Sequence, residues 1–208
     1  AKALIDSPGT HTMDQSMKDI LIGKDPLDIS KRWEELYIGT AMTGRRGAGV
    51  NAIGAIDMAL WDIKGKYENK PVYELMGGNF HETITPYASL QPLGSSFEEY
   101  RDSLVEWAEK ARNLGFRAVK SEVTMNGPYA HNGMEENDEK HTLVLEAVRK
   151  ALGPEIKLMV DVQYKWKTAE DALRTVKDWK EFDIYFLETP VWTDSLDDYA
   201  RMHEEAPM

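Results

Sequence analysis

The 208 residues carry 36 acidic against 25 basic side chains, a formal net charge of −11, and no cysteine. So acidic a chain argues against a nucleic-acid partner, because phosphate contacts need clustered Lys and Arg. The lack of cysteine excludes disulfides and thiolate metal sites, so a metal ion would need oxygen or nitrogen ligands. No apolar run approaches the roughly 20 residues of a membrane helix, and the start lacks the apolar core of a signal peptide. We therefore expect a cytoplasmic protein whose partner is a metal ion or small molecule, with neither nucleic acid nor membrane.

The first part of the chain has a helical pattern. Residues 25–37 predict one helix, and the mostly apolar residues 50–70 predict a second. Pro71 then opens a short helical turn that a pair of glycines closes. Three side chains of the second helix are expected in a core: Met58, Leu60 and Trp61. No strand pattern alternates with these helices, so residues 1–83 predict a separate helical cap region.

From about residue 84 onward, short β-type runs alternate with amphipathic helical stretches, which is the pattern of parallel βα units. Strands are expected at 84–90, 117–123, 156–162 and 184–189, and helices at about 97–114, 138–152, 169–182 and from 194 or 195 to the end. The sequence thus predicts an α/β fold in which residues 84–208 supply the first four units of a TIM-type barrel. A complete barrel typically needs about 250 residues, so this chain can hold only part of one.

Three of the expected strands carry charged residues near their ends. Lys120 and Glu122 lie two apart on the second strand and so share one face, while the third strand has Asp161 and the fourth has Glu188. In a parallel βα array the active site lies at the carboxyl ends of the strands. Two neighbouring carboxylates repel each other unless a cation lies between them, and oxygen-only ligands suit Mg²⁺. The alternative is that Asp161 and Glu188 cap the following helices or pair with Lys120.

Four stretches resemble one known family. Residues 47–78, GAGVNAIGAIDMALWDIKGKYENKPVYELMGG, are similar to the helix and turn that precede the barrel in the mandelate racemase and muconate lactonizing branch of the enolase superfamily. AVKSEV (118–123) resembles the family's Lys-x-Lys strand, VDVQYKW (160–166) its Asp-bearing metal strand, and FLETPVWTDSLDDYA (186–200) its Glu-bearing strand. The resemblance covers roughly residues 20–208. It implies the mostly helical part of an α+β capping domain at 1–83 and the first half of a (β/α) barrel at 84–208.

The resemblance also implies a chemistry. Asp161 and Glu188 would be the first two of three carboxylate ligands to Mg²⁺, while the third ligand, a His–Asp pair and the last barrel strands are not in this sequence. The family removes the proton α to a carboxylate, and Mg²⁺ stabilises the resulting enediolate. We expect an acid-sugar dehydratase and a homo-oligomer. A racemase, epimerase or cycloisomerase of the same superfamily is the alternative, and an inactive fragment or a chain completed by a partner is the alternative of another class.

One position departs from the family pattern at the site. Lys120 matches the first lysine, and Glu122 stands where the second, usually a base, would be. A carboxylate beside a lysine is expected to have a lowered pKa and to be a weak base. Glu122 would then orient Lys120 or bind a substrate hydroxyl, which favours a one-base dehydratase over a two-base racemase. A plain ion pair between Glu122 and Lys120 is the structural alternative.

The remaining candidates are polar or aromatic residues in loops. Gln163 stands where the family often has Asn, and it keeps an amide that can hydrogen-bond the substrate. The loop after the second strand offers Tyr129, His131 and Asn132 as residues expected to contact the substrate. The cap offers Arg45 and Arg46, and the loop after the fourth strand offers Trp192. The alternatives are a solvated loop, surface arginines and a tryptophan packed under a loop.

Overall fold

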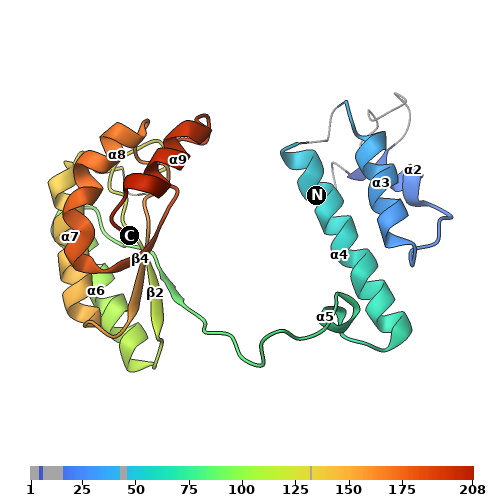
Figure 1. Ribbon diagram of the computed structural model, residues 1–208, viewed down its shortest axis with the longest axis horizontal. Coiled ribbons are helices and arrows are strands. Elements are labelled where there is room, and N and C mark those ends of the chain that lie inside the picture. The colour runs from blue at the N-terminus through green and yellow to red at the C-terminus, as the bar shows by residue number, and fades with distance from the viewer. Residues whose placement is uncertain (1–4, 7–15, 43–45, 132) are drawn as a thin grey trace. The chain divides into compact units, whose positions relative to one another are not determined.

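The computed structural model describes residues 5–6, 16–42, 46–131 and 133–208. The chain divides into two compact units, Ala1–Glu82 and Thr83–Met208 (Figure 1). Within the described ranges, no helix is both long enough and apolar enough to cross a membrane. Each unit has its own hydrophobic core.

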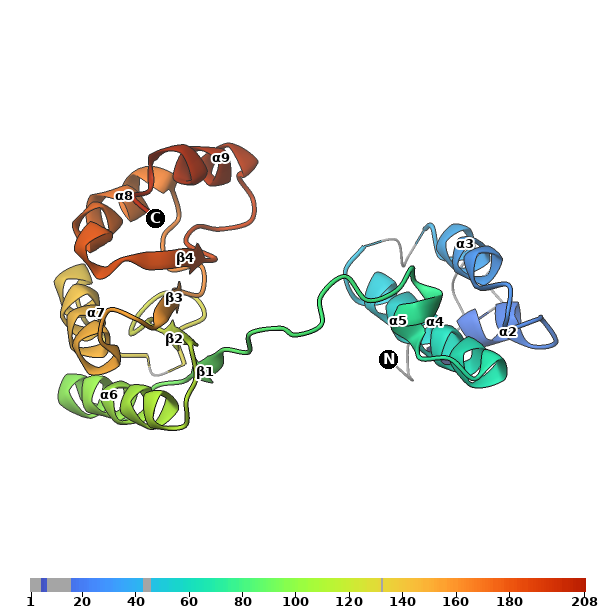
Figure 2. The ribbon, with the colours of Figure 1, turned by 60° about the horizontal axis from the view of Figure 1, so that its bottom comes forward.

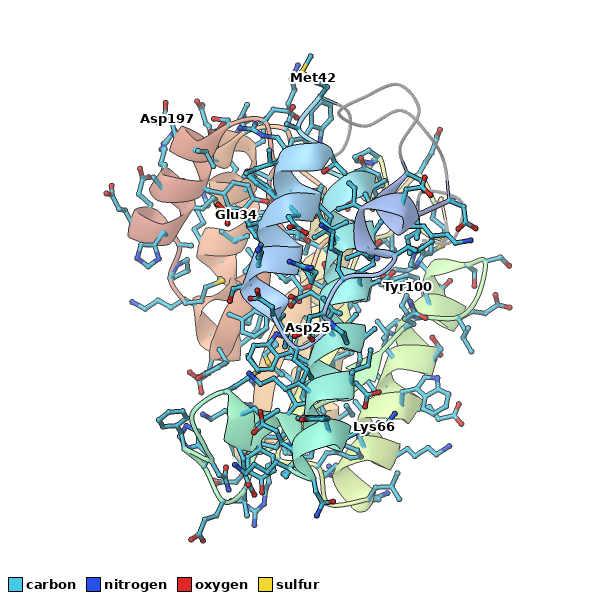
Figure 3. The ribbon with its side chains drawn as sticks, turned by 90° about the vertical axis from the view of Figure 1, so that its right-hand side faces the viewer. Asp25, Glu34, Met42, Lys66, Tyr100 and Asp197 are labelled. Carbon is cyan, nitrogen blue, oxygen red and sulfur yellow. The ribbon has the colours of Figure 1, made fainter. Side chains whose placement is uncertain are left out.

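The first unit is helical in its described residues. Its helices are α2 (Met17–Leu21), α3 (Ile29–Gly39), α4 (Ala48–Glu68) and α5 (Val72–Leu75). α2 and α4 both contact α3, and Figure 3 shows Glu34 on α3 and Lys66 near the end of α4. The buried apolar side chains of this unit are Met17, Ile29, Leu36, Ala52, Ile53, Ile56 and Leu60.

Two features of this unit differ from the sequence-based expectation. The short helix α2 was not predicted, although Ser16 and Asp19 form a reciprocal capping box at its start. Met58 was predicted in the core and is 70% exposed. Met58 lies two residues from Ile56 and from Leu60, which places it on the opposite side of α4 from these buried side chains.

The second unit contains a parallel sheet covered by helices. Its strands are β1 (Ala88–Leu90), β2 (Ala118–Glu122), β3 (Lys157–Asp161) and β4 (Ile184–Glu188), and they lie in the order β1-β2-β3-β4. Its helices are α6 (Phe97–Asn113), α7 (Asp138–Leu152), α8 (Ala169–Val176), the 3₁₀ helix η1 (Lys177–Phe182) and α9 (Leu196–Glu205). All three strand pairings are parallel. The predicted α/β fold with four βα units is therefore confirmed.

The sheet has one helix-covered face. Figure 2 shows α6, α7 and α8 along that face. There the strand side chains of Val119, Leu158 and Val160 are fully buried and belong to the core of the unit. Each α-helix of this unit starts just after the loop that follows a strand, at an N-cap whose side-chain oxygen accepts a hydrogen bond from a backbone N–H: Ser96, Asn137, Thr168 and Ser195. These caps fix where each loop at the carboxyl end of the sheet stops.

Two elements differ from their predicted bounds. β1 begins at Ala88, where pairing with Val119 starts, rather than at residue 84. Pro86 has no N–H to give to a strand ladder, which is consistent with the late start. The helix expected at 169–182 is α8 followed by the tighter 3₁₀ helix η1, whose C-cap residue Asp183 has a left-handed backbone.

Candidate functional site

Three carboxylates form a row across the carboxyl end of the sheet. Glu122 is the register partner of Asp161, and Asp161 is the register partner of Glu188. Partners in parallel strands project to the same face, and alternation along β2 puts Val119 and Ser121 on the helix side. The three acids therefore belong to the face opposite the helices, together with Lys120.

Lys120 lies between two of the acids. Its Nζ donates to Glu188 Oε2 at 2.7 Å and lies 3.9 Å from Asp161 Oδ2. Burial favours a lower pKa for Lys120, but the hydrogen bond and the charge of Glu188 outweigh it and raise the pKa. Lys120 is thus held here as a cation paired with two carboxylates.

Asp161 is held in a fixed orientation. Its Oδ1 accepts hydrogen bonds from the backbone N–H of Gln163 at 3.0 Å and from Thr189 Oγ1 at 2.9 Å. Gln163 and Thr189 both have positive φ values, 46° and 49°, which are uncommon for residues other than glycine. The two strand ends therefore adopt a costly backbone geometry next to this carboxylate, and its Oδ2 is left facing Lys120.

Asp161 and Glu188 match Mg²⁺ in donor chemistry, since both offer carboxylate oxygens from rigid strand ends. Among the residues that the structure describes, no three acidic or histidine side chains form a cluster able to hold a metal ion. The third acid of the row, Glu122, is engaged elsewhere. These residues thus fit part of a Mg²⁺ shell, with two protein ligands.

Glu122 is buried, with 6% of the residue exposed. Gln91 Nε2 lies 3.5 Å from its Oε2, and His131 Nδ1 lies 3.0 Å from its Oε1. Burial raises the pKa of Glu122, against the opposing effects of His131 and Gln91. The predicted lowering of this pKa by Lys120 is therefore wrong, because the Lys120 ammonium is directed to Glu188 and Asp161. The alternative ion pair between Glu122 and Lys120 is replaced by the pair with His131.

Aromatic side chains from three loops line a pocket of about 510 Å³. Its lining residues are Pro128, Tyr129, Tyr164, Trp192, Thr193 and Asp194. The rings of Tyr129 and Tyr164 meet edge to face at 5.4 Å between centroids. Lys167 Nζ lies 5.6 Å from the centre of the Trp192 ring. The structure thus brings together Tyr129 and Trp192, two of the predicted substrate-binding residues.

A lysine that the sequence-based analysis missed joins the two loops behind this pocket. Lys165 Nζ lies 3.0 Å from Asp138 Oδ1 and also donates to Asn126 Oδ1. Asp138 Oδ2 in turn accepts from Trp166 Nε1 at 2.9 Å and from Thr175 Oγ1 at 2.7 Å. The backbone at Gly127, with φ 122°, comes so close that a Cβ there would lie 3.3 Å from Lys165 Cα. The loops after β2 and β3 are therefore held tightly against each other.

Tyr100 was also missed by the sequence-based analysis. Its ring comes from α6 (Figure 3) and is fully buried. The hydroxyl accepts from the backbone N–H of Thr124 at 2.8 Å and donates to the carbonyl of Glu122 at 3.4 Å. It therefore fixes the end of β2 next to the site. In the sequence it is indistinguishable from any other aromatic residue on a core-facing helix.

The other predicted residues are Arg46, Arg45, Asn132 and Gln163. Arg46 is exposed and belongs to the first unit. Arg45 and Asn132 lie outside the described residues. Gln163 is at the site, and its side-chain Oε1 is buried with no hydrogen-bond donor within the described part of the chain.

Two family models match the chain. Residues 103–208 match the enolase C-terminal domain-like family, and residues 8–77 match the N-terminal domain of mandelate racemase and muconate lactonizing enzyme. The chain belongs to the mandelate racemase and muconate lactonizing enzyme family. The family predicted from the sequence motifs is thereby confirmed. Enzymes of the enolase superfamily depend on Mg²⁺ in general.

Relatives of this family include sugar-acid enzymes. D-galactarolactone cycloisomerase of Agrobacterium fabrum is 34% identical over 93% of this chain, and arabinonate dehydratase of Saccharolobus solfataricus is 32% identical over the same share. In both cases the match covers 48% of the relative. A racemase from Streptomyces coelicolor, solved with bound magnesium, superposes with a TM-score of 0.76 at 30% identity, covering 91% of this chain and 49% of that one. The chain thus spans about half the length of the family members it matches.

Proposed function

We propose that this chain supplies part of a Mg²⁺-dependent enzyme that removes the proton α to the carboxylate of an acid sugar, with dehydration as the outcome. The observation that carries the proposal is the in-register row of Glu122, Asp161 and Glu188 with the Lys120 ammonium among them. With a divalent cation on Asp161 and Glu188, the Lys120 ammonium would be released from these carboxylates to pair with an anionic substrate at the strand ends. The sugar-acid relatives among cycloisomerases and dehydratases support the choice of substrate.

Each residue of the site has a distinct part in this proposal. Asp161 and Glu188 would hold Mg²⁺, which when bound supplies charge stabilisation for the enediolate. Lys120 would bind the substrate carboxylate through its ammonium. Gln163 has a buried amide oxygen with no hydrogen-bond donor among the described residues, and it would accept a hydrogen bond from a substrate hydroxyl.

The aromatic pocket provides the substrate-recognition part of the proposal. Tyr129 and Trp192 offer apolar ring faces to the C–H groups of a sugar chain, and Asp194 at the rim can accept hydrogen bonds from its hydroxyls. A pocket wall with both aromatic and polar groups suits a polyhydroxylated acid better than it suits a purely apolar acid. We further propose that residues 1–83 contribute to a capping domain and residues 84–208 to the barrel.

The test uses the full-length protein with Mg²⁺ and a panel of acid sugars. Formation of a 2-keto-3-deoxy acid from one member of the panel supports the dehydratase proposal. Inversion of the α carbon without loss of water would instead support a racemase, and ring opening of a lactone would support a cycloisomerase. If no member of the panel exchanges its α-proton in D₂O, the proposed chemistry itself is contradicted.

A further inference from the structure

The starting observation is the contact between a strand carboxylate and a loop imidazole. Glu122 ends β2 and is buried, whereas the side chain of His131 is 56% exposed in the loop that follows. His131 Nδ1 lies 3.0 Å from Glu122 Oε1. The pair therefore joins a rigid acid to a solvent-accessible ring at the carboxyl end of the sheet.

Glu122 needs this partner. Its Oε1 is buried and has no aligned hydrogen-bond donor within the described residues, and Gln91 approaches Oε2 only at 3.5 Å. A buried carboxylate oxygen without a hydrogen-bond donor costs free energy, so alignment of a nearby donor with it is favourable. Alignment of the His131 Nδ1–H with Oε1 would supply this donor. This tautomer leaves the lone pair of Nε2 free for another group.

The neighbouring groups leave no better candidate for accepting a proton on this side of the row. Lys120 is a cation bound to Glu188 and Asp161, so it has no lone pair to offer. Glu122 Oε1 lies 3.0 Å from His131 Nδ1, and its Oε2 lies 3.5 Å from Gln91 Nε2. Asp161, the register partner of Glu122, also acts on it, and this acid strengthens the demand for a proton or cation near Glu122.

We propose that His131 is a proton acceptor for the α-proton of the substrate and that Glu122 is the residue that positions it. This inference rests on the proposed function, and it assigns the base for one face of the substrate. In the transfer, the Cα–H bond breaks and an Nε2–H bond forms, while the electron pair of the broken bond passes into the enediolate. The imidazolium that results is balanced by the Glu122 carboxylate through Nδ1–H, and the proton then leaves Nε2 for water. The arrangement follows the general logic of an imidazole oriented by a carboxylate.

The inference changes the expectation for Glu122. Because Glu122 stands at the position of the family's second lysine, the sequence-based expectation was that the site lacks one of its two bases. The structure instead offers a base supplied by the loop, held by the acid that replaced the lysine. Proton removal from this face is then retained, with an imidazole in place of a lysine amine as the base.

The first experiment needs no activity. Nitrogen NMR of the imidazole rings distinguishes the two tautomers, and the His131 signals are identified, among those of the five histidines of the 208-residue chain, as the ones missing in His131→Asn. Because Glu122 accepts from Nδ1–H, the neutral His131 ring should carry its proton on Nδ1, and Glu122→Gln should shift the ring towards the Nε2–H tautomer. Glu135→Gln removes the same charge from an exposed position in the same loop and should leave the tautomer unchanged. An unchanged tautomer in Glu122→Gln, with the amide spectrum intact, would overturn the pair.

The second experiment follows α-proton exchange in D₂O with the full-length protein and both enantiomers of an accepted substrate. His131→Asn should slow exchange of one enantiomer by at least about 100-fold and leave the other within about twofold. The double variant Glu122→Lys with His131→Asn, which returns an amine to the strand position, should restore part of the lost exchange. If His131→Asn changes the exchange rates of both enantiomers by the same factor, the assignment is overturned while the proposed function stands. No exchange by the unaltered protein would overturn both, and the NMR measurement of the His131 tautomer would still report whether the pair exists.

Discussion

The strand ends and the loops of the second unit place their functional side chains by different means. Lys120, Asp161 and Glu188 are placed by the register of neighbouring strands, where side-chain direction follows from a period of two. Tyr129 and His131 are placed by contacts between loops, including the pair with Glu122 and the ring contact with Tyr164. The proposed metal ligands are therefore fixed by strand register, whereas the proposed base His131 and the proposed recognition residue Tyr129 depend on contacts of the loops.

The largest effect expected from this contrast concerns a strand-end acid. Asp161→Asn in the full-length protein should reduce kcat by about 1,000-fold or more, equivalent to about 4 kcal/mol of transition-state stabilisation, because it removes charge at the centre of the site. The melting temperature should stay close to that of the unaltered protein, since the residue is not part of the apolar core. Steady-state kinetics and a thermal melt measure the two quantities.

The control for this variant is Asp197→Asn, which removes the same charge from an exposed position on α9. It should leave kcat and the melting temperature unchanged. Retention of full activity in Asp161→Asn would remove the metal site from the proposal.

The second prediction tests whether the loops depend on one buried cation. The Lys165 side chain is only 5% exposed and pairs with Asp138, which is partly exposed. Removing one partner of a buried ion pair costs about 3–5 kcal/mol, and the exposure of Asp138 reduces this to about 2–3 kcal/mol. Lys165→Met should lower the free energy of unfolding of the chain by this amount in urea titrations.

Lys167→Met is the matched control, since Lys167 is exposed and is close only to the Trp192 ring. Its effect on the free energy of unfolding should stay within about 0.5 kcal/mol. Equal effects of the two variants would show that the loops are held by packing alone.

The sequence supplied the strand half of the site because its signals are local. Acids that end successive apolar strands identify Asp161 and Glu188, and the two-residue spacing puts Lys120 on the same face as Glu122. The role of Lys165 depends on Asp138 and Asn126, which are distant in sequence and meet only in the folded unit. The raised pKa of Glu122 has the same origin, since burial and the direction of the Lys120 side chain are tertiary properties. Periodicity and residue spacing therefore predict neither the contacts of Lys165 nor the pKa of Glu122.

The third prediction uses a histidine that contrasts with His131. His141 is fully buried, and its ring accepts from the backbone N–H of Met125 at 3.1 Å through Nε2. Burial, helped by the charge of Lys165, lowers the pKa of His141 to about 4. The unfolded chain binds this proton near pH 6.5 and the folded chain does not, so folding stability falls as the pH drops from about 6.5 towards 4.

Between pH 7 and pH 5 the loss should be about 2 kcal/mol, measured by urea unfolding at each pH. In His141→Gln this part of the pH dependence should disappear, while His131→Gln should leave it in place because His131 is exposed in the loop. The same slope in both variants would assign the pH dependence to other groups.

The smallest effect is expected at the recognition pocket. Trp192 is 37% exposed and lines the pocket with Tyr129 and Tyr164. If its ring packs against the sugar chain both before and during the reaction, Trp192→Ala should raise KM about tenfold with little change in kcat, which corresponds to about 1.4 kcal/mol of uniform binding. Trp107→Ala is a matched control, because Trp107 is 39% exposed on α6 and is not among the lining residues of the pocket. KM should be unchanged in that variant. A fall in kcat at constant KM in Trp192→Ala would instead mean that this loop residue acts in the transition state and not in substrate binding alone.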